Sequence, residues 1–507
     1  MQRETTNYTE ANETFGKKLL IQKFSNPLVL VFLVLAALFV SVVIYKLGII
    51  GAGAIMAITV GVPILVGIVA YPKFGITILI VASFFINYIS EFLPAQVPIG
   101  TLLDAITYLL ILGFFLKQKS ENDWSYFKNP ISVLIILWLA YNMLEVANPS
   151  AASVLAWIYT VRTVGFIMLM YFVFVYHIRT VSFIKYLFKL WLLLDVIAAL
   201  SAFQQEKFGY LSFEKKWLYS DPQRVSLLFI NGHMRKSGIF SDPVTFSYNM
   251  VIGALLCIAL MMSNIDIRKK IILGCMAIFF LTVMLYSGTR AAYVLLPASL
   301  LILAVLNFNR KVLIGTLIAG LMLVVLIVMP TSNPAIKRFQ SAFSPSKDAS
   351  YNVRAENQRK IKPYILSHPI GGGLGSVGVW GRRFAPNSML AKFPPDSGYV
   401  RVAVEMGYIG LFLFCTLFFV VLKNGINFFF LIKNPRLKNY CMAMVLVVFA
   451  FNIGNFPQQA IVQYPSNIIF YLSIAIIVAC MRLDLQQQNA PAATGNNTGT
   501  TALTELN

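Results

Sequence analysis

Charged side chains are scarce in this sequence. Asp, Glu, Lys and Arg make up 12% of its 507 residues, and hydrophobic residues make up 58%, whereas about a quarter of an average soluble domain is charged. A lipid solvent favours this composition, so the sequence predicts an all-α polytopic membrane protein. The formal net charge is +21. Because the cytoplasmic loops of membrane proteins collect Lys and Arg, this charge does not indicate a nucleic-acid partner, and we expect none.

Side chains that bind metals are also few. The five cysteines all fall inside apolar runs, which excludes a disulfide framework or a thiolate cluster in a loop. The three histidines, His177, His233 and His368, are scattered along the chain, whereas a metal site gathers several ligands. We therefore expect neither a metal nor another cofactor.

Long apolar runs make up most of the remaining chain. A membrane-spanning helix needs roughly 20 apolar residues, and by that rule we expect about 12–14 transmembrane helices. The first run is not followed by a small-residue cleavage site, so we expect it to be retained as a span. The candidate spans lie near 27–45, 48–71, 75–93, 101–116, 131–147, 158–177, 183–202, 243–263, 271–286, 291–307, 312–330, 399–422, 440–456 and 464–481.

Basic residues predict the orientation of these spans. If the loops alternate from a cytoplasmic N-terminus, the short inside loops carry most of the Lys and Arg, as the positive-inside bias requires. Both termini are then cytoplasmic, and two long loops lie outside. The regions are a cytoplasmic tail at 1–26, transmembrane helices at 27–202, a first outer loop at 203–242, transmembrane helices at 243–330, a large outer loop at 331–398, transmembrane helices at 399–481 and a disordered cytoplasmic tail at 482–507.

Seven ionisable residues within the spans or at their ends fall in the outer half of the membrane under this orientation. They are Asp104, Arg162, Asp195, Asp242, Arg290, Arg401 and Glu405. Charges inside a membrane are costly and by default mark function. A transport path would need members through the midplane as well, so this distribution predicts a site at the outer interface. Alternatively, Asp104 and Glu405 are solvated helix ends, and Asp195 pairs with Arg162 as a structural bridge.

The segment 331–398 is the candidate for soluble chemistry. It is basic and glycine-rich, which predicts an anionic partner, with anionic lipid headgroups as the alternative. Its stretch SHPIGGGLG contains His368, Gly373 and Gly375. A GxGxxG pattern begins at Gly373, but it lacks the strand–helix context of a dinucleotide site. We expect these glycines to let the backbone turn sharply and approach a ligand closely.

Four short motifs follow one another near the outer ends of the later spans. They are GIFSDPVTFSYNM from Gly238 to Met250, YSGTRAAYV with Arg290, Arg354 followed by ILSHPIGGGLG, and DSGYVRVAVEMGYIGLFLF beginning at Asp396. Over roughly 100–480, the chain resembles the O-antigen ligase and Wzy-type polysaccharide polymerase superfamily. That family shares a many-span membrane fold with a large periplasmic loop near its C-terminal end.

The resemblance implies an enzyme of the bacterial inner membrane that uses a glycan linked to undecaprenyl pyrophosphate. An acceptor hydroxyl attacks the anomeric carbon and the lipid pyrophosphate leaves, so the reaction needs no nucleotide sugar. Arg290 and Arg354 would stabilise the leaving charge, and Asp396 would act as a base or bind sugar hydroxyls. The expected substrate-binding residues are Arg162, Asp242, His368, Gly373, Gly375, Arg401 and Glu405. Expected partners also include membrane lipids and the flippase and chain-length regulator of the same pathway.

One departure from the family pattern bears on the reaction. Where ligases of this family place His-Asn, this chain has Asp396-Ser397. We therefore favour a polymerase of O-antigen, capsule or exopolysaccharide. The first alternative is a ligase that transfers the glycan to lipid A core. The second is a non-enzymatic flippase or exporter of lipid-linked glycan, which would require charges through the membrane rather than a long outer loop.

Overall fold

The computed structural model describes residues 27–92, 100–230, 232–308, 310–332, 337, 339–340, 343, 349–394 and 396–489. Within that part of the chain, 11 helices are long and apolar enough to cross a membrane, and three shorter apolar helices accompany them. This confirms the all-α polytopic fold. The predicted tail at 1–26 and residues 490–507 of the other predicted tail lie outside the described residues.

Residues 1–70 form a unit of their own, in which the described helix is α2 (Pro27–Ala70). This helix breaks at Gly48, where φ is 57° and ψ is −136°. A positive φ of this kind is accessible to glycine at little steric cost. The break separates the two apolar runs that the sequence predicts as spans 27–45 and 48–71.

The second unit, residues 71–507, begins with five helices. They are α3 (Pro72–Phe92), α4 (Gly100–Glu121), α5 (Pro130–Leu144), α6 (Val154–His177) and α7 (Val181–Lys207). Side chains of Asn129, Ser153 and Thr180 accept backbone hydrogen bonds at the starts of α5, α6 and α7. Such N-caps satisfy donors that have no partner inside the helix. They therefore fix where these helices begin.

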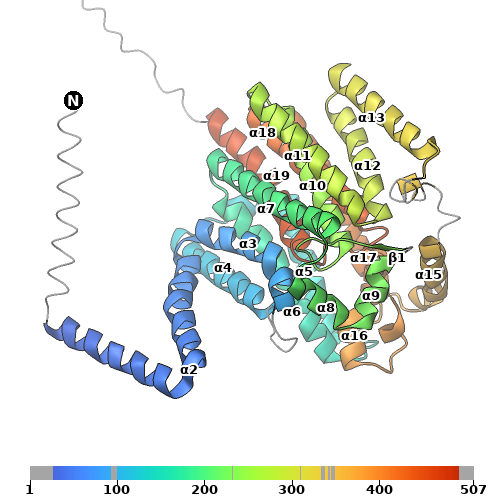
Figure 1. Ribbon diagram of the computed structural model, residues 1–507. Coiled ribbons are helices and arrows are strands. Elements are labelled where there is room, and N and C mark those ends of the chain that lie inside the picture. The colour runs from blue at the N-terminus through green and yellow to red at the C-terminus, as the bar shows by residue number, and fades with distance from the viewer. Residues whose placement is uncertain are drawn as a thin grey trace, which may run out of the picture. The chain divides into compact units, whose positions relative to one another are not determined.

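The core of this unit lies around α10 (Pro243–Met261), α18 (Pro435–Gly454) and α19 (Ser466–Asn489). Between 72% and 83% of the apolar window of each is buried inside the protein, against 22% for α11. A helix that is apolar all round belongs in such a central position. Figure 1 shows α10, α18 and α19 enclosed by neighbouring helices, with α13 at the periphery.

Four more helices complete the apolar part of the unit. They are α11 (Ile267–Tyr286), α12 (Arg290–Leu306), α13 (Arg310–Val328) and α17 (Gly398–Leu431). The segment predicted at 271–286 is thus part of a 20-residue helix, because three basic residues at its start, outside the apolar run, also adopt helical structure. In contrast, α12 has only 17 residues. Helix α17 breaks at Gly407, where φ is 63°.

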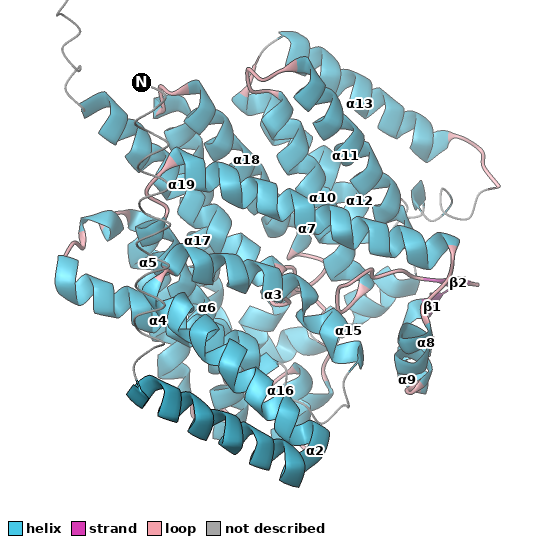
Figure 2. Cartoon of the chain, turned by 60° about the vertical axis from the view of Figure 1, so that its left-hand side comes forward, coloured by secondary structure: helices cyan, strands magenta, loops and turns pink. Residues whose placement is uncertain are grey.

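The polar segments fold into small elements that lie at one end of this unit (Figures 1 and 2). The longest is α15 (Ala349–Ser367), and the first long loop contains a two-stranded antiparallel hairpin. The others are α8 (Ser212–Tyr219), α9 (Pro222–Leu228), β1 (Phe229–Ile230), β2 (His233–Met234), α16 (Gly378–Phe384) and the 3-10 turns η2 (Glu145–Ala147) and η4 (Leu390–Lys392). The 3-10 turn η1 (Ser125–Phe127), between α4 and α5, lies at the opposite end.

Helix α19 extends to Asn489, through the first residues of the region predicted as a disordered tail. The carboxylate of Asp484 accepts hydrogen bonds from the backbone N–H groups of Lys433 (3.0 Å) and Asn434 (2.8 Å). This contact attaches the end of α19 to the turn between α17 and α18. It accounts for the additional helical turns.

Candidate functional site

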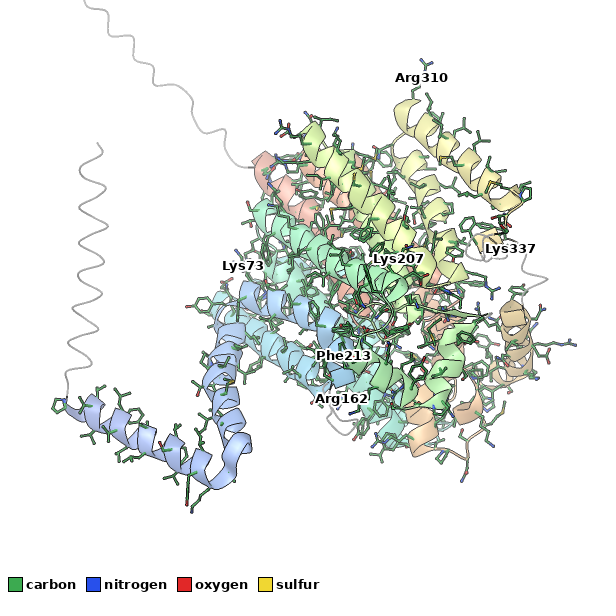
Figure 3. All side chains as sticks on the ribbon, viewed as in Figure 1. Lys73, Arg162, Lys207, Phe213, Arg310 and Lys337 are labelled. Atoms are coloured by element: carbon green, nitrogen blue, oxygen red, sulfur yellow. The ribbon has the colours of Figure 1, made fainter. Side chains whose placement is uncertain are left out.

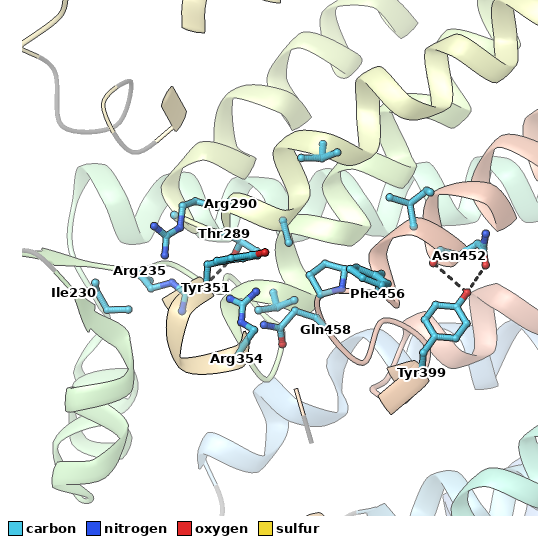
Figure 4. Close-up of a pocket in the computed structure, with 16 residues that line it drawn as sticks. Ile230, Arg235, Thr289, Arg290, Tyr351, Arg354, Tyr399, Asn452, Phe456 and Gln458 are labelled. Carbon is cyan, nitrogen blue, oxygen red and sulfur yellow. Dashed lines mark hydrogen bonds between the residues drawn. The ribbon is translucent and has the colours of Figure 1, made fainter. Parts of the chain in front are cut away.

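A cavity of about 580 Å³ lies at the end of the second unit that carries the polar elements. Three arginines line it, and they come from three segments far apart in the sequence: Arg235, Arg290 and Arg354. Figure 4 shows these arginines gathered on one side of the cavity, with Tyr399 at the other. Among the described residues that line the cavity, none is an Asp or a Glu. Three guanidinium groups that line one cavity suit it to an anion.

Arg235 follows the hairpin β1–β2 and is held by the turn between α11 and α12. Its Nε donates to the Ser287 carbonyl (2.8 Å) and its Nη2 donates to the Thr289 hydroxyl (2.9 Å). The Thr289 hydroxyl in turn donates to the Pro243 carbonyl at the start of α10 (3.1 Å). The backbone N–H of Lys236 also donates to the Tyr286 carbonyl (3.1 Å). The guanidinium group is thus fixed before any ligand arrives.

Arg290 is the first residue of α12 and follows a tight turn. Gly288 in this turn has a φ of 57°, which glycine adopts readily. Thr289, Arg290 and Ala291 all line the cavity, so the N-terminus of α12 faces it. A helix N-terminus carries partial positive charge and favours bound anions. The helix end therefore adds to the charge of the three arginines.

Arg354 comes from the first half of α15, one turn after Tyr351, which also lines the cavity. Asp396 lies near Arg354 but is not among the lining residues. Burial raises the pKa of the Asp396 carboxyl, and the charge of Arg354 partly opposes that rise. Asp396 is thus a half-buried carboxyl at the edge of an arginine-lined cavity.

The glycine-rich segment after α15 packs against the break in α17. The N–H groups of Gly372 and Gly373 donate to the carbonyls of Val404 and Glu405, both at 2.8 Å. A Cβ on Gly371 would lie 2.5 Å from the Glu405 backbone, and one on Gly407 would lie 2.0 Å from the Pro369 carbonyl oxygen. These glycines therefore permit a close approach between two segments of the protein.

Gly373 and Gly375 are positioned by their contacts with the start of α6 and the turn before it. A Cβ on Gly373 would lie 2.6 Å from the Ala151 Cβ, and one on Gly375 would lie 2.4 Å from the Thr160 hydroxyl. Both glycines have positive φ angles, of 90° and 86°. Neither is among the residues that line the arginine cavity.

Arg401 and Glu405 form an ion pair beside this glycine-rich segment. The Arg401 Nε lies 3.1 Å from the Glu405 Oε2, and Arg401 also donates to Gln459 (2.7 Å). The Glu405 carboxylate, which is 2% exposed, accepts from the backbone N–H of Val377. Both residues line a second, smaller cavity of about 100 Å³. Glu405 is thus a buried member of this pair rather than a solvated helix end.

Arg162 pairs with Asp104, not with Asp195. The Arg162 Nε lies 3.2 Å from the Asp104 Oδ2. Asp195 is fully buried elsewhere and packs against Gly253, where a Cβ would lie 2.5 Å from its Oδ2. The alternative of an Arg162–Asp195 bridge is therefore not realised, and Asp104, at 8% exposure, is not a solvated helix end.

Asp242 and His368 lie outside the set of residues that line the arginine cavity. Asp242 caps α10, because its carboxylate accepts from Val244 N (2.8 Å), Thr245 N (2.9 Å) and the Thr245 hydroxyl (2.7 Å). His368 stacks on Tyr364, with ring centroids 3.9 Å apart.

The sequence analysis missed Arg235. The available signal was its position in the polar stretch NGHMRKSG, just before the motif that begins at Gly238.

Of the ten predicted site residues, the structure brings Arg290 and Arg354 together in the cavity and places Asp396 at its edge. As for metals, the described part of the chain contains no group of three or more His, Cys, Asp or Glu residues arranged to hold an ion.

Comparisons with known proteins agree with the resemblance seen in the motifs. A family model described as O-antigen ligase matches residues 275–415, which include Arg290, Arg354 and Asp396. A protein from Salmonella muenchen named O-antigen polymerase is 26% identical over 204 residues. The matched region covers 38% of this chain and 48% of that protein, so the chain spans about half the length of this curated relative.

Proposed function

We propose that this chain, whose resemblance to the O-antigen ligase and Wzy-type polymerase superfamily is confirmed by both comparisons, is a polysaccharide polymerase. It would transfer a glycan from undecaprenyl pyrophosphate to an acceptor sugar hydroxyl at the periplasmic face of the bacterial inner membrane. The observation that supports this most is the convergence of Arg235, Arg290 and Arg354, from three segments far apart in the sequence, on one cavity.

The arginines are suited to the departure of a pyrophosphate. Guanidinium groups bind phosphate oxygens through paired N–H donors and remain charged at all relevant pH values. As the bond between the anomeric carbon and the phosphate oxygen breaks, its electron pair stays on the pyrophosphate. Donors that are already oriented toward this developing charge lower the barrier more than mobile ones. The hydrogen bonds of Arg235 to Ser287 and Thr289 supply this orientation.

Asp396 is the candidate base. The acceptor hydroxyl oxygen forms the new bond to the anomeric carbon, and its proton passes to the Asp396 carboxylate. A carboxyl whose pKa is raised by burial is a stronger base than an ordinary aspartate. The proximity of Asp396 to Arg354 keeps this base beside the leaving group.

The apolar part of the cavity suits the lipid end of the donor. Val244, Val294, Ile453 and Phe456 line it together with the arginines. Val294 and Phe456 are also exposed at the surface of the protein, by 39% and 68%. When the pyrophosphate of the lipid-linked donor contacts the arginines, its polyprenyl tail can therefore lie against an apolar surface that is continuous with the lipid-facing helices.

The cavity also groups connections between helices on one side of the membrane. The loop after α9, the α11–α12 turn, α15 and the segment after α18 all contribute to it, so these four connections share one side of the membrane. The positive-inside analysis predicts that side to be the periplasm, with both termini cytoplasmic. A flippase and a chain-length regulator of the same pathway are the expected partners.

The test is an in vitro assay in lipid nanodiscs with lipid-pyrophosphate-linked repeat units and no lipid A core. Wild type is expected to form a product ladder, and Arg290→Ala and Asp396→Asn are expected to lose it. Arg310→Ala is the matched control, because Arg310 is exposed at the opposite end of the unit (Figure 3). Transfer that occurs only after lipid A core is added would identify a ligase. Failure of both reactions with a verified donor would refute glycosyl transfer.

A further inference from the structure

A group of aromatic and charged side chains lies outside the arginine cavity, where α6 meets α16. Tyr159 packs against Trp380 and Phe384, with ring centroids 4.7 and 5.0 Å apart. Trp380 and Phe384 are nearly parallel, with an angle of 17° and centroids 6.0 Å apart. We call these three rings the α6–α16 aromatic cluster. All three are partly exposed.

Two guanidinium groups border this cluster. Arg162 lies over the Tyr159 ring at 5.3 Å, and Arg383 lies over the Phe384 ring at 5.5 Å. Arg162 is fixed by its ion pair with Asp104, whereas Arg383 is exposed. An exposed cation–π contact contributes only about 0.5–1 kcal/mol. Arg383 can therefore move aside at small cost and uncover ring surface.

The segment 455–465 runs from the arginine cavity to the part of α6 that carries Arg162. Phe456, Pro457 and Gln458 line that cavity. Further along the segment, Ile461 and Val462 line the second cavity together with Thr160 and Thr163 of α6, which flank Arg162 in sequence. The charges of Asp104 and Arg162 act in opposite directions on the pKa of Tyr464, which burial raises. Tyr464 lies seven positions after Pro457 in the sequence, which limits the distance between them to about 25 Å. A short oligosaccharide can bridge such a distance.

We propose that the α6–α16 aromatic cluster, together with the Arg162–Asp104 pair, binds the acceptor glycan. Sugars present apolar C–H faces, which pack on aromatic rings, and hydroxyl groups, which pair with guanidinium donors and carboxylate acceptors. This cluster offers both kinds of surface side by side. The Arg162–Asp104 pair has no net charge, so it suits a polyhydroxylated chain better than an anionic headgroup. This proposal rests on the proposed polymerase function.

The role assigned to the cluster differs from that of the arginine cavity. The cavity would bind the pyrophosphate end of the donor, whereas the cluster would bind acceptor sugars away from the reacting bond. An acceptor that dissociates less often receives more additions before it leaves. Loss of the cluster should therefore shorten the products.

The experiment measures binding and product length separately. Free oligosaccharide, released from its lipid pyrophosphate by mild acid, is titrated against protein in nanodiscs and followed by saturation-transfer NMR. Trp380→Ala is expected to bind it about fivefold or more weakly and to shift the product ladder to shorter chains. Trp380→Phe, which keeps a ring, should recover part of both. Trp124→Ala is the matched control, because Trp124 is also partly exposed but lies in the connection between α4 and α5.

The outcomes separate this proposal from the polymerase function. Arg290→Ala should bind the free oligosaccharide as wild type does, because that ligand has no pyrophosphate. If wild type forms a ladder but Trp380→Ala keeps both wild-type binding and wild-type product lengths, the acceptor proposal is refuted while the polymerase stands. If Trp380→Ala changes only the quenching of tryptophan fluorescence by brominated lipids, the cluster is a membrane anchor and the proposal is also refuted. Folding of each variant is checked by gel filtration and thermal unfolding.

Discussion

Replacing Arg235 is the sharpest test of the arginine cavity, because this residue was found only from the structure. Its guanidinium group donates hydrogen bonds to Ser287 (2.8 Å) and Thr289 (2.9 Å), while its charge faces the cavity. Removing one oriented donor at a developing negative charge typically lowers kcat by about 10²–10³-fold. We expect a loss of this size for Arg235→Ala.

Arg235→Lys is expected to lose less activity. Lysine keeps the positive charge but carries a single ammonium group, which cannot reproduce the planar fork of donors that contacts both Ser287 and Thr289. We expect a loss of about tenfold. Because this variant retains the charge and loses the orientation, the difference between Lys and Ala measures the contribution of charge alone.

The assay should follow the release of lipid pyrophosphate under single-turnover conditions and steady-state kinetics in parallel. If Arg235 acts mainly in the transition state, kcat and kcat/KM fall together; if it only binds the donor, KM rises while kcat stays unchanged. Arg224→Ala is the matched control, since Arg224 lies in the adjacent helix α9 and pairs with Asp221 and Trp217 rather than with the cavity. A folded Arg235→Ala protein with a rate within threefold of wild type would refute the reasoning.

Three further predictions follow from contacts around the site. Gly407→Ala should lower the free energy of unfolding by about 2–4 kcal/mol, because φ is 63° and the added Cβ would lie 2.0 Å from a backbone oxygen. Gly315→Ala is the control: an added Cβ at Gly315 would lie in open space, so this variant should change the unfolding temperature little. Burial raises the pKa of Asp396, so the transfer rate of wild type should fall with decreasing pH at a higher pH than an ordinary aspartate would cause. The small residual rate of Asp396→Asn, measured under single-turnover conditions, should lack this acidic limb. Arg401→Gln should lower the free energy of unfolding by about 3 kcal/mol, because it leaves Glu405 buried without its cation. Adding Glu405→Gln should restore part of the lost stability. A loss of activity without a loss of stability would contradict this structural role.

The sequence predicts the membrane fold well because a span has a strong signature in apolar length. It predicts helix starts less well, because hydropathy ignores caps and polar turns. The span expected at 158–177 begins at Val154, since Ser153 caps it. Likewise α11 begins at Ile267, because its basic first turn is helical although it is not apolar.

The candidate site was predictable only in part. Arg290, at the start of α12, and Arg354, in α15, each stand in a recognisable motif. Arg235 stands in a long polar loop, and no local pattern shows which of its basic residues turns back toward the α11–α12 turn. The glycines and Glu405 illustrate a different limit, because a glycine that approaches a ligand and one that approaches a neighbouring backbone have the same sequence signal.

The glycine-rich segment still bears on the chemistry, through the position of α15. Its hydrogen bonds to Val404 and Glu405 fix the C-terminal end of α15 against α17. Ile361 and Tyr364, on the same helix, pack into the cluster that contains Val404. Arg354 lies about two turns before Ile361 on that helix, so its guanidinium group is placed by packing rather than by a flexible loop. Because an oriented charge stabilises a leaving pyrophosphate better than a mobile one, the break at Gly407 and the turns that pack on it help to hold one of the three arginines in the cavity.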